Sequence, residues 1–315
     1  VLSMVSLPDF DLNKRKKISD KKFINRSTKG VYELGSVFKT FTLAAGLQEK
    51  VIDIDTKFEN LPKKIKCAGR LISEYDMDIP STLTAEQILI RSGNIGSIKI
   101  AQKVGLVNYK KFLEDLDLLN KTQFDIEEIG NPIPFKWGKC KLATSAYGHG
   151  ITTTPLQLAK AYAIISNGGY KITPTLLKKE EYPLKGKQII SEKNSKKINS
   201  ILRKIVTSNE GTANLANIEG YEIAGKTGTA QKSIKGKYSK KKVNTFASIF
   251  PISSPKYVLI VLLDEPKLSE SYVYKYNDGK LRKLIGTPFN TAGWTSVEVA
   301  KNIIEKIGPI LAIKY

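Results

Sequence analysis

The chain has few of the residues on which several common kinds of site depend. Its 315 residues include two cysteines, Cys67 and Cys140, and one histidine, His149. Two cysteines are too few for a disulfide framework and lack metal-ligand spacing, and a single bridge between them is left open. One histidine gives a Ser/His/Asp triad no supporting context, and we interpret His149, in a glycine-flanked loop, as structural. We expect no metal and no cofactor.

Long hydrophobic runs are also absent. The longest, residues 257–263, has the length of a strand, far below the roughly 18 apolar residues that a membrane-spanning helix needs. We find no internal repeats and no low-complexity segments. Hydrophobic residues make up 41% of the chain and aromatic residues 9%. The composition therefore predicts a globular protein with a large core, in one big domain or two modest ones.

The chain has few acidic residues relative to basic ones. It contains 51 Lys and Arg against 30 Asp and Glu, which gives a formal net charge of +21. Such a charge attracts anionic partners such as nucleic acid or a membrane surface. The lysines are scattered, however, and the densest group, from Lys232 to Lys242, is interpreted as a solvated loop at a hairpin tip. We expect no nucleic-acid partner. A basic binding module is the competing hypothesis, and it predicts affinity that falls steeply with salt.

Strand-like composition occurs at both ends of the chain. The predicted strands lie at 1–12, 222–230, 245–250 and 257–263. The last three follow one another across short polar segments, a pattern typical of antiparallel hairpins.

Helical patterns predominate between these strands. Two capping boxes, Thr84-Ala85-Glu86-Gln87 and Thr154-Pro155-Leu156-Gln157, predict helix starts. Further helices are predicted at about 95–104, 108–118, 191–207 and 296–307. Residues 51–167 are helical and loop-rich, and 121–146 lack clear periodicity. The sequence therefore predicts an α+β fold: an antiparallel sheet flanked by helices, its sheet lobe (about 1–50 and 166–315) interrupted by an inserted helical lobe (about 51–165).

The stretch that organises the chain begins at Gly35-Ser36. It opens a segment that is apolar on nearly every face, which predicts a buried helix. Lys39 lies one turn after Ser36, so its amine can reach the serine hydroxyl. Ser-x-x-Lys occurs four times in the chain, and only this copy opens an apolar helix. The pattern indicates a serine nucleophile with an adjacent lysine.

Two further motifs accompany it. Ser92-Gly93-Asn94 falls at a predicted break between helices, where polar side chains can face a cleft. Lys226-Thr227-Gly228 lies on a predicted strand, where Gly228 would let a substrate backbone come close. Ser-x-x-Lys, Ser-x-Asn and Lys-Thr-Gly in this order are the signature of penicillin-binding proteins and class A β-lactamases.

Over essentially its whole length the chain resembles the transpeptidase domain of class B penicillin-binding proteins, and among these the cell-division (septal) peptidoglycan D,D-transpeptidases. The matching stretches are VSLPDFD (5–11), YELGSVFK (32–39), YGHG (147–150), TPLQ (154–157), GTA (211–213) and AGKTGTAQ (224–231). The resemblance implies a serine β-lactamase/D,D-peptidase-like fold. It also implies an upstream membrane helix and pedestal domain outside this sequence, and a place on the periplasmic face of the bacterial inner membrane.

The resemblance implies a role for each motif residue in acyl transfer. Ser36 would be the nucleophile and Lys39 its base, provided that burial and the neighbouring Lys226 lower the pKa of Lys39. Lys226 would also orient Ser92 and help to hold the substrate carboxylate. The backbone N–H groups of Ser36 and Thr229 would form the oxyanion hole.

Ser92 and Asn94 would serve the substrate's peptide bond, Ser92 by relaying a proton to the leaving group and Asn94 by binding the amide. Thr227, Gly228 and Thr229 would bind the terminal carboxylate. The implied substrate is a peptidoglycan stem peptide ending in D-Ala-D-Ala, which loses D-Ala and joins an amine on a neighbouring strand through an acyl-serine intermediate.

The resemblance also implies β-lactams as covalent inhibitors, and division-machinery membrane proteins, including a glycan-strand polymerase, as partners. The nearest alternative is a β-lactamase or β-lactam sensor of the same fold, for which we find no clear glutamate to activate a deacylating water. An elongation-type transpeptidase and an inactive scaffold are the others.

Overall fold

The computed structural model describes residues 1–11, 13–14, 21–178, 186–234, 236–267, 271, 273–275, 281–283 and 290–314. Its α-helices are α1 (Lys39–Gln48), α2 (Ala85–Ile90), α3 (Asn94–Val104), α4 (Leu106–Asp115), α5 (Lys139–Ser145), α6 (Pro155–Ser166), α7 (Glu192–Thr207) and α8 (Ser296–Lys314). Short 3₁₀ helices are η1 (Lys21–Phe23), η2 (Gly35–Phe38), η3 (Asn214–Ala216) and η5 (Ala292–Trp294). The strands are β1 (Lys57–Phe58), β2 (Lys64–Cys67), β3 (Arg70–Ser73), β4 (Leu83–Thr84), β5 (Ala224–Ile234), β6 (Lys237–Phe250), β7 (Tyr257–Asp264), β8 (Val273–Lys275) and β9 (Leu281–Lys283).

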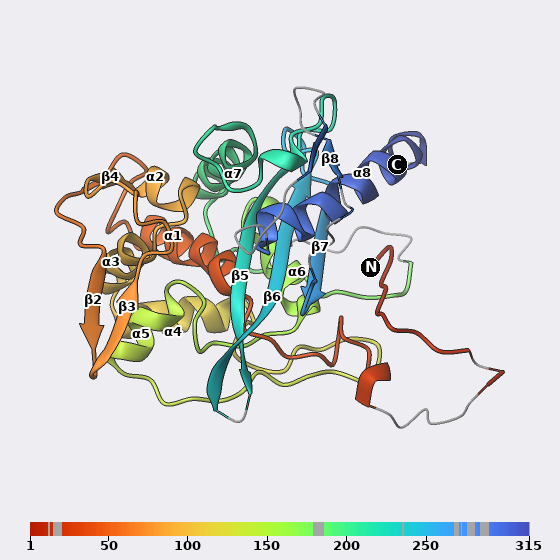
Figure 1. The fold of residues 1–315 in the computed structure, drawn as a ribbon, viewed down its shortest axis with the longest axis horizontal. Coiled ribbons are helices and arrows are strands. Elements are labelled where there is room, and N and C mark those ends of the chain that lie inside the picture. Colours follow the sequence, from red (N-terminus) through yellow and green to blue (C-terminus); the bar gives the residue numbers. More distant parts are fainter. Residues whose placement is uncertain are drawn as a thin grey trace.

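The main sheet is antiparallel, in the order β5-β6-β7. On β5, Thr227 pairs with Phe246 of β6, and Thr229 pairs with Asn244. Helices α6 and α8 contact this sheet from opposite sides (Figure 1). The predicted α+β class, with an antiparallel sheet flanked by helices, is confirmed.

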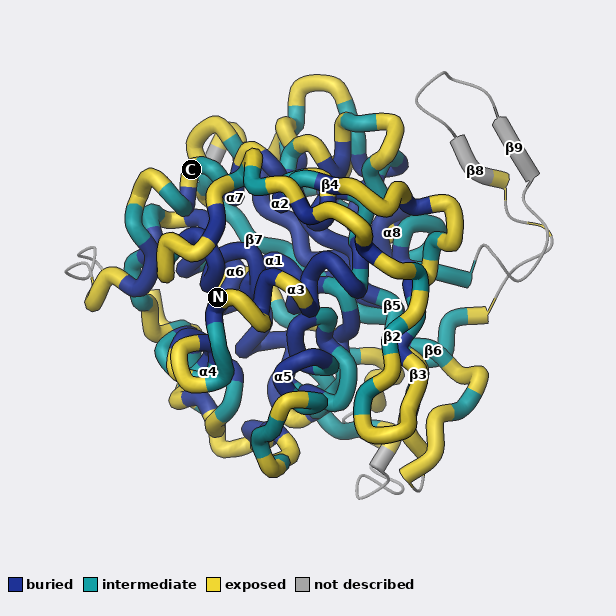
Figure 2. Tube along the Cα trace, turned by 90° about the vertical axis from the view of Figure 1, so that its left-hand side faces the viewer, coloured by how far each residue is buried: buried dark blue, intermediate teal, exposed yellow. Residues whose placement is uncertain are grey.

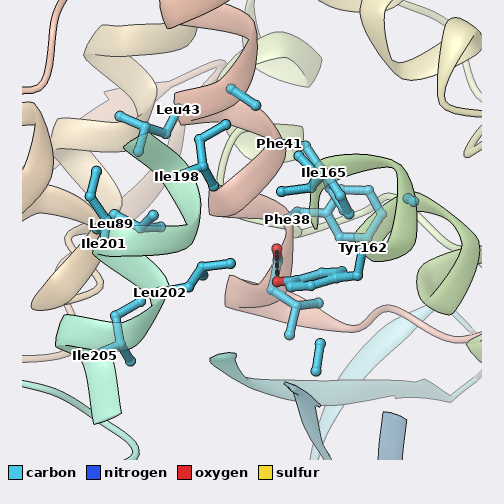
Figure 3. Packing of buried hydrophobic residues seen from close by; sticks show 14 of the residues in the cluster. Phe38, Phe41, Leu43, Leu89, Tyr162, Ile165, Ile198, Ile201, Leu202 and Ile205 are labelled. Carbon is cyan, nitrogen blue, oxygen red and sulfur yellow. Dashed lines mark hydrogen bonds between the residues drawn. The ribbon is translucent and has the colours of Figure 1, made fainter. Parts of the chain in front are cut away.

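Helix α1 lies at the centre of the core. Every residue from Lys39 to Leu47 is buried, as the apolar residues on nearly every face of this helix predict (Figure 2). It packs against α3 and α7. Phe38 lies in the turn before α1 and Phe41 in its first turn. Their rings pack edge to face with centroids 5.5 Å apart, and the ring of Phe41 packs in the same way against that of Tyr162 of α6, with centroids 5.4 Å apart (Figure 3). Such contacts fix the axial position of the helix that carries Lys39.

Both predicted capping boxes are present. Thr84 and Thr154 each accept a hydrogen bond from the backbone N–H of the residue three positions on, at 3.2 Å. Gln87 and Gln157 return the contact to the capping residue's backbone, so α2 and α6 begin where the sequence predicts.

One predicted strand is absent from the part of the chain that the structure describes, and one predicted loop is shorter than expected. The described residues of the first segment, 1–11, form no strand. Its alternating residues face no core, since Val5 and Leu7 are 72% and 66% exposed. The segment from Lys232 to Lys242 does form a hairpin tip, as predicted, but most of it is strand and not loop, because β5 continues to Ile234 and β6 begins at Lys237. Cross-strand pairing therefore extends through the basic segment.

The region 51–167 holds more than helices and loops. β1 pairs with β4 and β2 with β3, in ladders too short to give a period in the sequence. Helix α5 lies in the segment without periodicity, and a disulfide joins Cys67 of β2 to Cys140 of α5. Helix α8 runs to Lys314, beyond the predicted end at residue 307. Among the described residues no helix has both the length and the apolar character needed to cross a bilayer.

Candidate active site

A cleft of about 930 Å³ brings together segments that are far apart in the sequence. Six of the predicted site residues line it, namely Ser36, Lys39, Ser92, Asn94, Thr227 and Thr229. The other two, Lys226 and Gly228, lie on the same strand, β5, as the two threonines. The three sequence motifs therefore meet at one place.

Ser36 lies in η2, the turn that leads into α1. Gly35 before it has φ +63°, a conformation that favours glycine. A Cβ on Gly35 would also lie 2.8 Å from the carbonyl oxygen of Thr229. The turn therefore rests directly on β5, which places the backbones of Ser36 and Thr229, the two predicted oxyanion donors, in adjoining segments.

Two buried lysines converge on the hydroxyl of Ser92. Lys39 Nζ donates to Ser92 Oγ at 3.1 Å and also to the Ser92 carbonyl oxygen. Lys226 Nζ donates to the same Oγ at 2.9 Å and to the carbonyl oxygen of Thr227 at 3.2 Å. Lys39 is 2% exposed and Lys226 is fully buried. One hydroxyl thus links the amines of two different elements.

Burial changes the protonation of both lysines. It lowers the pKa of Lys39 to about 7, against an opposing effect of the Glu74 carboxylate. Burial also lowers the pKa of Lys226 well below its ordinary value, and the charge of Lys39 adds to this effect. Near neutral pH a large fraction of Lys39 is therefore a neutral amine, the form that can take a proton from a hydroxyl.

Ser92 occupies the sharp turn between α2 and α3. Its φ is +60°, an uncommon conformation for a residue with a side chain. Strained backbone of this kind persists only where the surroundings hold it, and it clusters at functional sites. Asn94 helps to hold this turn, because its Nδ2 donates to the carbonyl oxygen of Ser73 at 2.8 Å.

The threonines of β5 are hydrogen-bonded to neighbouring loops. The hydroxyls of Thr227 and Thr212 share a hydrogen bond of 2.6 Å, and Thr229 Oγ1 accepts one from the backbone N–H of Ala292 at 3.0 Å. These contacts orient both side chains at the cleft.

Gly228 is also required by a close contact within the chain itself. A Cβ there would lie 2.1 Å from the carbonyl oxygen of Leu34 and 3.0 Å from Val37 Cγ1. The chain's own turn before α1 therefore makes a close approach that requires glycine at this position.

The cleft is also lined by charged groups to which no chemistry is assigned from the sequence. Arg91 forms ion pairs with Asp76 at 3.0 Å and with Glu210 at 3.3 Å. Glu74, 8% exposed, accepts hydrogen bonds at the start of α3. One signal could have suggested such a carboxylate: Gly93 precedes α3 and offers no side chain to cap it.

An aromatic group stands at another part of the cleft. The ring of His149 stacks on Tyr147 and Tyr238, with centroids 5.8 Å and 4.5 Å away. Burial lowers the pKa of His149, so the ring is neutral near pH 7. In the described part of the chain no group of His, Cys, Asp and Glu side chains is arranged to hold a metal ion.

Comparison with known proteins agrees with this geometry. The profile of the family "Penicillin binding protein transpeptidase domain" matches residues 1–288. The chain is 31% identical to "Probable peptidoglycan D,D-transpeptidase FtsI" of Caulobacter vibrioides, covering 100% of this chain and 52% of that protein. It is 32% identical to "Stage V sporulation protein D" of Bacillus subtilis, covering 85% and 44%.

Among solved structures, the transpeptidase domain of Burkholderia pseudomallei penicillin-binding protein 3 superposes with a TM-score of 0.77 at 25% identity, covering 91% of this chain and 82% of that one. The chain spans about half the length of the curated relatives named above. Because the family profile covers most of the sequence and the motif residues meet in one cleft, the chain belongs to the penicillin-binding protein transpeptidase domain family.

Proposed function

We propose that the protein is a serine-type peptidoglycan D,D-transpeptidase, which cross-links stem peptides that end in D-Ala-D-Ala. One observation carries the proposal: Lys39 and Lys226 both donate to Ser92 Oγ in the cleft that Ser36 lines. A neutral amine one turn from a hydroxyl is a means of activating a serine. Membership of the transpeptidase family supports the same reaction.

In the first half-reaction Ser36 Oγ attacks the carbonyl carbon of the penultimate D-Ala while neutral Lys39 takes its proton. The oxyanion that forms would be held by the backbone N–H groups of Ser36 and Thr229, each such donor contributing roughly 3 kcal/mol to lowering the barrier. Ser92 passes the proton to the leaving amine, which departs as D-Ala. The product is an ester between the shortened stem peptide and Ser36.

Other residues hold the substrate in place. Asn94 binds the peptide amide, and Thr227 and Thr229, with the amine of Lys226, bind the terminal carboxylate. In the second half-reaction an amine of a neighbouring strand attacks the ester, loses its proton through the same groups and frees Ser36. β-Lactams acylate Ser36 in the same way, because their ring amide takes the place of the D-Ala-D-Ala bond.

The cellular setting is also a proposal. We place the protein on the periplasmic face of the inner membrane, with a membrane helix and a pedestal domain upstream of this chain, and division-machinery proteins, including a glycan-strand polymerase, as partners. The disulfide between Cys67 and Cys140 supports an oxidising compartment. We propose a septal role, with elongation as the alternative, and within the chain a sheet lobe (1–50 and 166–315) and a helical lobe (51–165).

Mass spectrometry of the intact protein with benzylpenicillin tests the reaction. We expect one adduct that persists for hours, maps to the Ser36 peptide and is lost in Ser36→Ala. The Ser253→Ala variant, at another Ser-x-x-Lys copy, should label normally. An adduct that vanishes within seconds would assign the chain to the β-lactamases, and labelling of Ser36→Ala would show that another residue is the nucleophile.

A further inference from the structure

Glu74 is a buried carboxylate in the cleft that the reaction scheme above does not use. It directly follows β3, lines the cleft and is 8% exposed. Its own backbone N–H donates to the carbonyl oxygen of Lys63 at 2.9 Å, which fixes it beside β2. Burying a carboxylate costs free energy unless it is hydrogen-bonded or paired with a positive charge. The contacts of the Glu74 carboxylate therefore indicate its role in the cleft.

The first set of contacts is with the start of α3. Gly93 precedes this helix and has no side chain to cap it. Instead, the backbone N–H groups of Asn94 and Ile95 donate to the two carboxylate oxygens of Glu74, at 2.6 Å and 2.8 Å. Helix N-termini favour negative charge, so this contact is stabilising. It ties the turn that holds Ser92 to the segment after β3.

The second effect is on the buried lysines. Lys39 and Lys226 place two amines on one hydroxyl, that of Ser92, and like charges so close disfavour each other. The Glu74 carboxylate raises the pKa of Lys39 against the larger, opposite effect of burial. Glu74 therefore supplies a counter-charge to Lys39 within the cleft that both residues line.

Other charges face the same cleft from neighbouring elements. They are Asp76, Arg91, His149, Glu210 and Lys242. Both carboxylates of this set form ion pairs with Arg91, and burial holds His149 neutral near pH 7. The acidic residues other than Glu74 are thus partly neutralised by a nearby cation.

We propose that Glu74 is a positioning residue for acyl transfer at Ser36: its carboxylate holds the turn that carries Ser92 and Asn94, and it supplies a negative charge that acts on Lys39. This inference rests on the proposed function. Its two parts can be separated, because an amide at this position keeps the size of the side chain and loses the charge, whereas aspartate keeps the charge and loses reach.

The test is the second-order rate constant for acylation of Ser36 by a fluorescent penicillin, measured against pH for the wild type and three variants. In Glu74→Gln the pKa of Lys39 falls further, so the acid limb of the profile should move to lower pH by about half a unit or more. Its plateau should fall about tenfold, because one amide oxygen replaces two acceptors. Glu74→Asp should lower the plateau and leave the acid limb in place.

Glu210→Gln is the matched control, since it removes a charge from the same cleft where Arg91 already neutralises it. Its acid limb should coincide with that of the wild type. Thermal melting shows whether each variant is folded. If Glu74→Gln does not fold, the plateau rate constant of Glu74→Asp tests the inference in its place. An unchanged plateau in Glu74→Asp, an unmoved acid limb in a folded Glu74→Gln, or an equal movement in Glu210→Gln would overturn the inference. Absence of labelling in the wild type would instead overturn the proposed function.

Discussion

Lys39 should make the reaction depend on pH, because the burial of its side chain lowers the pKa of its amine. Its pKa of about 7 means that the base is increasingly protonated below neutral pH. We expect the rate constant for β-lactam acylation to fall about tenfold for each pH unit below this value. Stopped-flow fluorescence with a labelled penicillin from about pH 5 to about pH 9 measures the profile. A flat profile through the acid range would contradict Lys39 as the base.

Replacing Lys39 separates its catalytic role from its structural one. The pKa of this group is lower in the folded chain, about 7, than its ordinary 10.5. Between these two values the unfolded chain binds more protons, so the stability contributed by Lys39 rises with pH and is least favourable at neutral pH and below. Lys39→Met should therefore not lower the melting temperature near pH 7. Because it removes the base, it should reduce acylation by about 10²-fold to 10⁴-fold.

Differential scanning calorimetry and penicillin labelling of the same preparation check both parts of this prediction. Lys160→Met is the comparison, since Lys160 is also buried but pairs with Asp117 at 2.6 Å. Its loss should destabilise the protein, because it leaves a carboxylate with one partner fewer. A melting temperature that drops equally in both variants would show that Lys39 also stabilises the fold.

At the scale of elements, the position of Ser36 depends on how closely the turn before α1 approaches β5. In Gly228→Ala the added Cβ would meet the carbonyl oxygen of Leu34 at 2.1 Å, so one of the two segments must move. We expect a loss of about 1–3 kcal/mol in the free energy of unfolding and a fall of about tenfold or more in acylation. Gly138→Ala, where a Cβ meets nothing within 4 Å, should leave acylation unchanged in labelling and lose less stability in urea titration, since the only cost is a poorer cap for α5.

Signals that act within a few residues were read correctly from the sequence. The capping boxes at Thr84 and Thr154 place α2 and α6, because a cap and its partner lie three positions apart. The segment after Ser36, apolar on nearly every face, likewise predicts the buried helix α1. The three motifs give the candidate residues of the cleft, since their spacing within each motif is short and fixed.

Features that depend on distant contacts were missed or misread. Alternation in residues 1–11 resembles a strand, but the described chain provides no partner for it. Glu74 meets the helix start at Asn94, 20 positions away; Gly93 leaves that helix without a side-chain cap, but no local pattern identifies the residue that supplies one. The close contact of Gly228 is made by Leu34, so its cause cannot be read from its neighbours in the sequence.

At the scale of the whole molecule, the cleft is formed by walls that one covalent bond holds together. The disulfide joins Cys67, at the end of β2, to Cys140 in α5, across 73 positions of sequence. Hairpin β2–β3 leads into Glu74 on one wall, and α5 leads into the Tyr147–Gly150 segment, part of which forms another. The bridge therefore restrains two cleft-forming segments that the sequence places far apart.

Reduction of this bridge should loosen both segments. A cross-link over a loop of this length stabilises a protein by about 2–4 kcal/mol, so dithiothreitol should lower the free energy of unfolding by about that amount and slow acylation of Ser36. The Cys67→Ser/Cys140→Ser double variant is the control: it should resemble the reduced wild type and be insensitive to reductant. Urea titration with and without reductant, with penicillin labelling of each sample, measures both effects. If the oxidised wild type and the double variant unfold at the same urea concentration, the bridge does not stabilise the cleft walls, and contacts such as those of Glu74 hold them unaided.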